Sequence, residues 1–174
     1  PYEYYEKYRV RKYGFHGTSH KFVARVGAEM FGLDFENSKI VTCHIGNGAS
    51  VTAVKNGKSF DTSMGFTPLD GLVMGTRAGS MDVSAATYVA EKEGMSYKEL
   101  DAMLNKKSGV VGISGVSSDM REVNAAAKDG NKRAQLSNTM YFYRIKKYIG
   151  AYAAAMGGVD IIIFAGGVGE NQAD

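Results

Sequence analysis

The pattern of apolar and polar positions divides the chain into strand-like and helix-like segments. Residues 40–65 join β-branched runs through two glycine-containing turns, which predicts three strands connected as hairpins. The run DIIIFA at 160–165 is typical of a strand buried in the middle of a sheet. Apolar residues at helical spacing predict helices over the approximate ranges 21–31, 83–93, 97–107 and 132–156.

Less regular segments separate these elements. Residues 1–13 mix aromatic and charged side chains and are expected to form a helix or an extended lead-in. Residues 66–82 contain three glycines and little periodicity, so we expect a long, ordered and functional loop. Residues 108–115 (SGVVGISG) predict a short buried strand. Residues 166–171 (GGVGEN) are expected to turn out of the last strand, with a helix beginning only at their end.

Short polar side chains mark the expected helix starts. Thr18 or Ser19 is predicted to cap the first long helix, because a hydroxyl can accept a hydrogen bond from the first turn. Ser118 or Asp119 is predicted to cap a helix near residue 120. The order of elements indicates an α/β fold with a mixed sheet, in which antiparallel hairpins are combined with parallel crossovers. At 174 residues without an internal repeat, the chain is expected to form one domain.

Composition narrows the class of protein. Charged residues make up 22% and hydrophobic residues 44%, as in ordinary globular proteins. The net charge of +3 is small and its cations are dispersed, so neither a nucleic acid nor a membrane surface is expected as a partner. No apolar run approaches the length of a membrane span, and no signal peptide is recognisable. The single cysteine, Cys43, lies in a predicted strand and is interpreted as a buried hydrophobe, which suits a reducing cytoplasm.

Two glycine turns follow predicted strands, at 46–48 and 166–169. Glycines leave backbone N–H groups uncovered, so such a turn can approach a phosphate closely. Neither turn matches a Walker motif or a full dinucleotide fingerprint, and each alone is better explained as a structural turn. Together with Asp119 and Arg121 they favour a nucleotide site. Arg77 is the one cation of the loop at 66–82, and its small neighbours leave it free to reach a ligand.

All three histidines, His16, His20 and His44, lie beside glycine turns. A zinc site is one interpretation, but Gly17 stands where an HEXXH motif requires glutamate. Donation to a phosphoryl oxygen fits the glycine surroundings better. Capping or packing histidines remain the alternative, above all for His20.

Four ordered motifs carry a resemblance to a known family. FHGTSH at 15–20, CHIGNGAS at 43–50, DTSMGFTPLDGLVMGTRAG at 61–79 and FAGGVGEN at 164–171 resemble acetate kinases, members of the acetate and sugar kinase/Hsp70/actin superfamily. Propionate and butyrate kinases share much of this pattern. The resemblance implies an actin-like (ribonuclease H-like) ATPase domain whose β-hairpin forms a phosphate loop flanked by helices. It also implies reversible phosphoryl transfer between ATP and acetate, giving ADP and acetyl phosphate.

The resemblance implies roles by position. His16 and Arg77 match residues that hold the transferring phosphoryl group in its transition state. The remaining matched positions surround the nucleotide: His44, Asn47, Gly48, Asp119, Met120, Arg121, Gly167, Val168, Gly169, Glu170 and Asn171.

Members of this family are considerably longer, so residues 1–174 are expected to be a truncated nucleotide-binding domain, with 1–13 leading in from another domain. The acetate pocket and the Mg²⁺ ligands are expected in segments outside the chain, and this chain is expected to supply no metal ligand. The resemblance also implies a cytoplasmic homodimer. The chain alone is expected to bind ATP or ADP weakly without turnover. Two alternatives stay open: a stand-alone nucleotide-binding module and a metal-dependent hydrolase that uses the three histidines.

Overall fold

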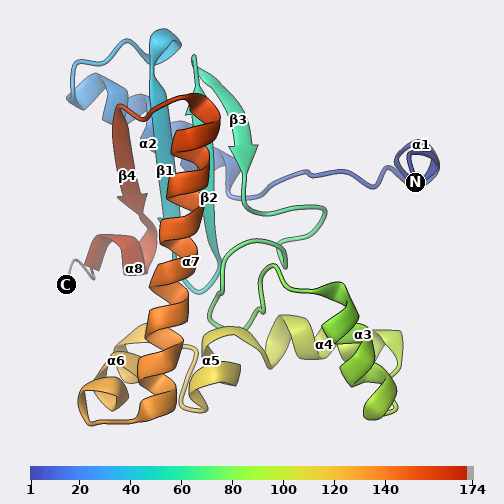
Figure 1. Cartoon of the computed structure of the whole chain (residues 1–174). Helices are drawn as coiled ribbons and strands as arrows, with labels where there is room; N and C mark the ends of the chain where they lie inside the picture. Colours follow the sequence, from blue (N-terminus) through green and yellow to red (C-terminus); the bar gives the residue numbers. More distant parts are fainter. Residues whose placement is uncertain (172–174) are drawn as a thin grey trace.

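The computed structural model describes residues 1–171 and shows a four-stranded mixed sheet between helices (Figure 1). The strand order is β3–β2–β1–β4, formed by Lys58–Thr62, Ala49–Lys55, Lys39–Ile45 and Ile161–Ala165. The first three strands are antiparallel neighbours, whereas β4 pairs parallel with β1. A parallel pair needs a long crossover, and the helical segment between β3 and β4 provides it. The predicted α/β class, the hairpins and the mixed sheet are confirmed.

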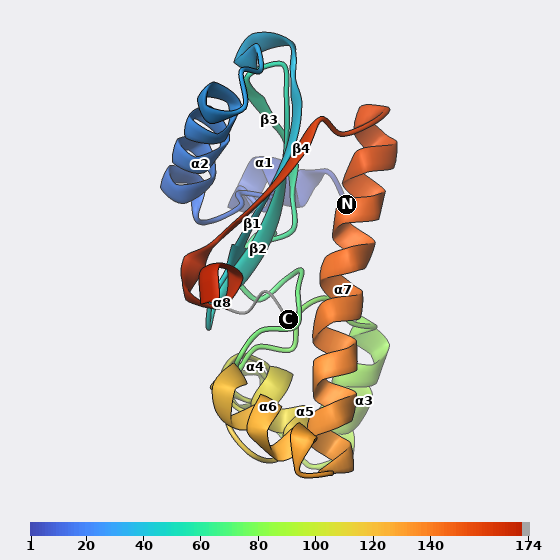
Figure 2. The ribbon, with the colours of Figure 1, turned by 90° about the vertical axis from the view of Figure 1, so that its left-hand side faces the viewer.

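Two long helices cover opposite faces of the sheet (Figure 2). α2 (Gly17–Met30) packs on one face and α7 (Lys132–Met156) on the other. Side chains of a strand alternate between the two faces. In β1, Ile40 therefore packs with the α2 cluster, while Val41 and Cys43 pack with the α7 cluster. Burial raises the pKa of the Cys43 thiol to about 12, which agrees with the buried hydrophobe expected from the sequence.

Four shorter helices lie beyond the end of the sheet, two of them packed on α7 and the other two extending to one side (Figure 1). They are α3 (Val83–Lys92), α4 (Tyr97–Lys106), α5 (Gly109–Ser114) and α6 (Met120–Lys128). Polar side chains cap three of these helices and α7: Asp82, Ser96, Asp119 and Asn131. The helices predicted at 83–93, 97–107 and 132–156 are thus confirmed, and so is the cap at Asp119.

The strand predicted over 108–115 is wrong, because this segment forms α5. A short apolar run does not distinguish a strand from a buried helix, and tertiary hydrogen bonds decide here. The first free N–H groups of α5 meet the loop at 66–82: Val110 donates to the carbonyl of Met74 at 2.8 Å, and Val111 to that of Gly75 at 3.0 Å. At its other end, the guanidinium of Arg133 donates to two α5 carbonyls at 2.7 Å each.

The turn predicted after β4 is also wrong, because the chain passes directly into α8 (Gly166–Asn171). Gly166 has φ of +83°, which lets the backbone change direction without a loop. The Glu170 carboxylate accepts a hydrogen bond from the Gly166 N–H at 3.1 Å and so satisfies the first turn. The helix therefore begins four residues earlier than Glu170, and any continuation past Asn171 lies outside the described residues.

The predicted cap of α2 at Thr18 or Ser19 is wrong as well. The helix begins at Gly17, and His16 occupies the cap position with φ of +59° and no capping side-chain bond. The Ser19 hydroxyl instead bonds His44 Nδ1 at 2.9 Å. At the N-terminus, α1 (Glu3–Tyr8) is a short exposed helix that stands apart from the sheet (Figure 1).

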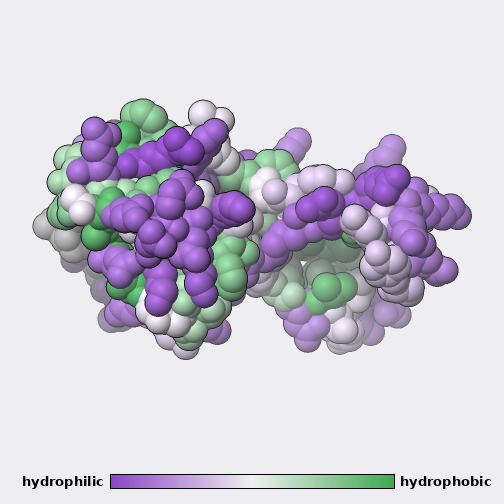
Figure 3. All heavy atoms as spheres, turned by 90° about the horizontal axis from the view of Figure 1, so that it is seen from above, coloured by the Kyte–Doolittle hydropathy of each residue, from purple (hydrophilic) through white to green (hydrophobic). Residues whose placement is uncertain are grey.

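The surface shown in Figure 3 mixes hydrophilic side chains with hydrophobic patches. Among the described residues, β4 has no partner on its outer edge. Exposed apolar side chains gather beside that edge: Phe22, Met30, Phe31, Ile162 and Phe164. An unpaired apolar edge of this kind favours association with further protein.

Candidate functional site

A cleft of about 820 Å³ opens where the carboxyl ends of the parallel strands β1 and β4 meet. Such an edge is the usual place for ligands in open α/β sheets. Its wall contains seven of the residues that the sequence suggested for a nucleotide: Asn47, Asp119, Met120, Arg121, Gly167, Val168 and Asn171. Segments separated by more than a hundred positions in the chain are thus brought to one cavity.

The glycine tip between β1 and β2 forms the floor of the site. Gly46 N–H donates across the tip to the carbonyl of Gly48 at 3.2 Å. The loop at 66–82 docks against this tip, because Gly75 N–H donates to the carbonyl of Asn47 at 3.0 Å. A Cβ on Gly75 would stand 1.9 Å from the Asn47 side-chain oxygen and 3.2 Å from the Ser118 carbonyl oxygen, so a larger residue there would displace the Asn47 side chain from its place at the tip.

His16 and Arg77 converge on Gly48. A Cβ at Gly48 would lie 3.2 Å from Arg77 Nη1 and 3.7 Å from His16 Nε2. The absence of that Cβ keeps open the space between a guanidinium and an imidazole. Both predicted phosphoryl-binding side chains therefore reach the same point at the end of the hairpin.

One nitrogen of the Arg77 guanidinium contacts the loop that carries it. Nη1 donates to the carbonyl of Pro68 at 3.3 Å and lies 3.6 Å from the sulfur of Met74. Its backbone is fixed because its carbonyl accepts from the N–H of Met74 at 3.1 Å, and the next N–H, of Ala78, donates to Leu104 at 3.0 Å. The loop is irregular but ordered, as predicted.

The three histidines form one cluster beside this point. The rings of His16 and His44 stack with their centroids 4.2 Å apart, and His20 lies 6.3 Å from each. Burial, then the nearby His44 and Arg77, lower the pKa of His16. Burial also lowers the pKa of His20 to about 4, with further contributions from His16 and His44. His20 is therefore neutral at physiological pH.

The buried His20 makes folding stability pH-dependent. Its pKa falls from 6.5 to about 4 on folding, so stability is complete above pH 6.5 and is lost as the pH falls toward 4. The shift corresponds to roughly 3 kcal/mol at most. We expect His20→Gln to reduce the loss of unfolding free energy between about pH 7.5 and about pH 4.5, measured by urea denaturation. An equal acid-induced loss in the wild type and the variant would contradict this assignment.

On the opposite wall, Asp119 and Arg121 form a two-point ion pair at the start of α6. Arg121 Nε donates at 3.1 Å to each carboxylate oxygen, and Nη2 donates to one of them at 2.5 Å. Asp119 also caps the helix through the N–H of Arg121 at 2.9 Å. These hydrogen bonds hold the pKa of Asp119 well below its usual range. Asp119 thus orients Arg121 and is not available as a proton donor.

The α8 residues divide between two surfaces. Gly167, Val168 and Asn171 line the cleft, and the Asn171 amide donates to the carbonyl of Gly167 at 2.9 Å. Gly169 lines a neighbouring apolar cavity that shares Tyr141 and Val168 with the cleft, and the Glu170 carboxylate turns back to Gly166. His44 and Gly48 do not line the 820 Å³ cleft. They lie beside it at the hairpin, close to His16.

Sequence reasoning missed several residues that shape the site. Gly75, Ser118 and Tyr141 line the cleft, and Ser50 bonds two of the histidines. Gly75 and Ser118 lie within two positions of Arg77 and Asp119, two predicted site residues, so their place in the sequence could have indicated them. Tyr141 lies in the middle of α7, and nothing local in the sequence marks it. Its hydroxyl is buried without a hydrogen-bond partner among the described residues.

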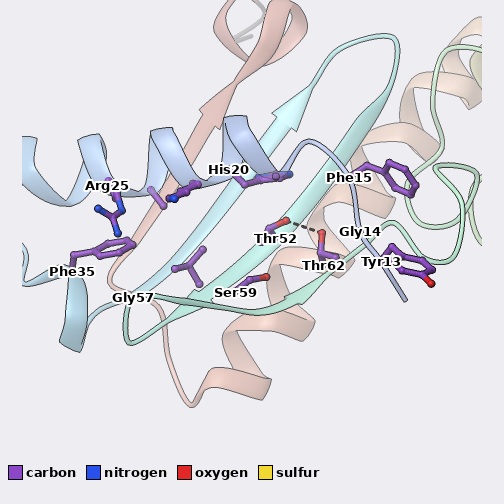
Figure 4. A pocket seen from close by; sticks show the side chains of 14 residues that line it. Tyr13, Gly14, Phe15, His20, Arg25, Phe35, Thr52, Gly57, Ser59 and Thr62 are labelled. Carbon is purple, nitrogen blue, oxygen red and sulfur yellow. Dashed lines mark hydrogen bonds between the residues drawn. The ribbon is translucent and has the colours of Figure 1, made fainter. Parts of the chain in front are cut away.

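A second cavity, of about 280 Å³, lies between α2 and the strands β2 and β3 (Figure 4). Arg25 stacks over Phe35 at one end with 5.3 Å to the ring centroid, and Tyr13 and Phe15 stand at the other. The hydroxyls of Thr52 and Thr62 bond each other at 2.7 Å across its wall. None of the residues predicted to bind nucleotide lines this cavity.

Within residues 1–171, no group of three or more His, Cys, Asp or Glu side chains is arranged to hold a metal ion. Hydroxyl groups engage both ring nitrogens of His20 and the Nδ1 atoms of His16 and His44. The geometry therefore gives the hydrolase alternative no support. No helix in the described part of the chain is both long and apolar enough to cross a membrane.

Comparisons with known proteins agree with this fold. A solved acetate kinase from Porphyromonas gingivalis superposes with a TM-score of 0.97 at 57% identity, and covers 99% of this chain. A propionate kinase from Francisella tularensis gives a TM-score of 0.94 at 46% identity over the same share. The sheet, the hairpin tip and the flanking helices thus define an α/β domain of the actin-like ATPase fold.

The Acetokinase family matches residues 1–174, and the chain belongs to that family. Among curated relatives, the acetate kinase of Phocaeicola vulgatus is 64% identical over all 174 residues, and that of Bacteroides thetaiotaomicron is 63% identical over 172. The chain covers 44% and 43% of these two proteins, so it spans less than half the length of the relatives it matches.

Proposed function

We propose that this chain provides the nucleotide wall and the phosphoryl-binding side chains of an ATP-dependent phosphotransferase. The reaction is reversible transfer between ATP and acetate, giving ADP and acetyl phosphate. The convergence of His16 Nε2 and Arg77 Nη1 on Gly48, next to the cleft, carries this proposal. A cation, an imidazole and uncovered backbone at one point suit a group whose charge is spread over several oxygens.

The proposed mechanism relies on positioning and charge. In phosphoryl transfer the transition state is loose, and negative charge develops on the equatorial oxygens. Arg77 stabilises that charge with its planar fork, and His16 donates a hydrogen bond from Nε2 when protonated. The tip at Gly46–Gly48 fits closely against the phosphate chain. Arg121, oriented by Asp119, and the α8 residues lie along the nucleotide.

The described residues do not fit a Mg²⁺ site. Asp119 is committed to Arg121 and Glu170 to Gly166, and no cluster of carboxylates faces the cleft within residues 1–171. We therefore propose that Mg²⁺ and the acetate pocket are held by parts of the protein outside this chain. Residues 1–174 are proposed to form most of one nucleotide-binding domain, with 1–13 leading in from a neighbouring domain.

The acceptor is proposed to be acetate rather than propionate or butyrate. The two most similar relatives compared above, at 63–64% identity, are named acetate kinases, and the propionate kinase structure is 46% identical. A cytoplasmic homodimer is proposed for the whole protein on the family resemblance. A nucleotide-binding module without catalysis is the second candidate, since the cleft lies entirely within this chain.

The assignment is tested on the complete polypeptide that contains this chain. With ATP and Mg²⁺ we expect acetyl phosphate to form from acetate, trapped as the hydroxamate, and at a lower rate from propionate and butyrate. The isolated chain should bind ADP without turnover. If the complete polypeptide binds ADP but forms no acyl phosphate, the nucleotide-binding module without catalysis would be favoured instead. A preference for propionate or butyrate would refute acetate as the acceptor but would leave the proposed reaction class unchanged.

A further inference from the structure

Ser50 lies between two imidazole rings of the site. It is completely buried at the start of β2, and its Oγ stands 2.8 Å from His16 Nδ1 and 2.7 Å from His20 Nε2. A serine hydroxyl carries one proton, so it can donate to only one of the two nitrogens. The other nitrogen must carry its own proton and donate to Ser50. The tautomers of the two neutral histidines are therefore linked through this hydroxyl.

The chain of hydrogen bonds continues beyond His20 and can run in either of two directions. His20 Nδ1 lies 2.7 Å from Thr42 Oγ1, and the Thr42 hydroxyl has the backbone carbonyl of Thr52 at 3.5 Å as a further acceptor. If Thr42 donates to that carbonyl, it accepts from His20 Nδ1–H. His20 Nε2 is then bare and accepts from Ser50. In the opposite direction Thr42 donates to His20 Nδ1, His20 Nε2–H donates to Ser50 and Ser50 donates to His16 Nδ1, so every hydroxyl proton has an acceptor there as well.

The surroundings of His16 decide between the two directions. When Thr42 donates to the Thr52 carbonyl, Ser50 accepts from His16 Nδ1–H, which leaves His16 Nε2 bare. Arg77 Nη1 and His16 Nε2 both approach the space above Gly48, where a cation favours a lone pair over an N–H. The titratable and charged groups described around His16 are His20, His44 and Arg77, none of them an anion.

We propose that Ser50 and His20 are positioning residues that fix neutral His16 as its Nδ1–H tautomer, with a bare Nε2 facing the cleft. His16 then takes one proton from solvent at Nε2 when a phosphate-type anion enters, and donates that proton in a hydrogen bond to an anion oxygen. Its Nδ1–H bond to Ser50 stays unchanged during this step. The identity of the anion rests on the proposed function, whereas the tautomer does not.

The tautomers are tested directly in this chain with isotope-labelled histidine, by NMR of the imidazole nitrogens at a pH where His16 is neutral. We expect His16 and His20 both to carry their proton on Nδ1. In Ser50→Ala the His16 ring should lose this preference and populate the Nε2–H form. Ser63→Ala is the matched control, because Ser63 is also buried and bonds only backbone nearby, at Val51 N–H. It should leave both rings unchanged.

An Nε2–H form of His16 in the unmodified chain would overturn the proposal, whether or not the variants fold. An unchanged His16 tautomer in a folded Ser50→Ala chain would overturn the role of Ser50. Inorganic pyrophosphate then serves as the anion, and the pKa of His16 should rise on saturation. Binding without that rise contradicts the proton uptake. Absence of binding counts against the proposed function, and the tautomer measurement still decides the positioning role.

Discussion

Arg77→Ala is expected to lower kcat of the complete polypeptide by about 10³–10⁵-fold, the range seen when an arginine that stabilises transferred phosphoryl charge is removed. Arg77 is fixed by its own loop and reaches the space above Gly48 next to His16. Its contribution should therefore be lost in the transition state more than in nucleotide binding, and the KM for ATP should change far less than kcat. Steady-state kinetics in the direction of acetyl phosphate formation measure both constants.

Two matched variants sharpen this expectation. Arg77→Lys keeps the charge but loses the planar fork, so its rate should fall between those of the wild type and the alanine variant. Arg25→Ala removes an arginine of α2 that stacks on Phe35 at the second cavity, and should leave kcat close to that of the wild type. Similar losses in the Arg25 and Arg77 variants would show a general effect of removing a cation and would refute the assigned role.

The largest expected effect on stability comes from Gly109→Ala. Gly109 has φ of +63°, and a Cβ there would stand 2.1 Å from the Met74 carbonyl oxygen and 2.6 Å from that of Arg77. These are backbone atoms, so neither can move aside as a side chain could. The left-handed conformation and the overlap together should cost about 2–5 kcal/mol of unfolding free energy. Urea denaturation of this chain measures the loss.

Gly94→Ala separates the cost of the left-handed conformation from the cost of the steric overlap. Gly94 has the same φ of +63°, but a Cβ there would meet nothing within 4 Å. Only the conformational cost, about 1–2 kcal/mol, should remain. Equal losses in the two variants would mean that the contact between α5 and the Arg77 loop is looser than the structure shows.

Much of the fold follows from local pattern. The β-branched runs around Gly46–Gly48 and the apolar run at 161–165 specify strands, because each agrees with its burial in the sheet. The strand prediction for 108–115 is wrong because the structure of this segment depends on the carbonyls of Met74 and Gly75, which are distant in sequence. The glycines at 166–169 suggested a turn, since glycine is a poor helix former, yet the Glu170 carboxylate completes the first turn of α8.

The candidate site likewise contains residues that local sequence indicates and residues that it does not. Glycine turns beside His16, Asn47 and Arg77 indicate phosphate chemistry, because uncovered backbone N–H groups combined with cations are suited to binding anions. Ser50 and Tyr141 carry no such signal, since a serine in a strand and a tyrosine in a long helix are ordinary core residues. Their importance arises only when the sheet brings Ser50 under two imidazoles and α7 carries Tyr141 to the cleft.

The cleft at the ends of β1 and β4 is expected to bind nucleotide, and NMR titration of this chain with ADP would locate that binding residue by residue. We expect the backbone signals that shift to belong to Gly46–Gly48, Ser118–Arg121 and Gly167–Asn171, and those lining the second cavity at Arg25 and Phe35 to stay unchanged. Shifts confined to the second cavity, or no shifts at millimolar ADP in a folded chain, would contradict it.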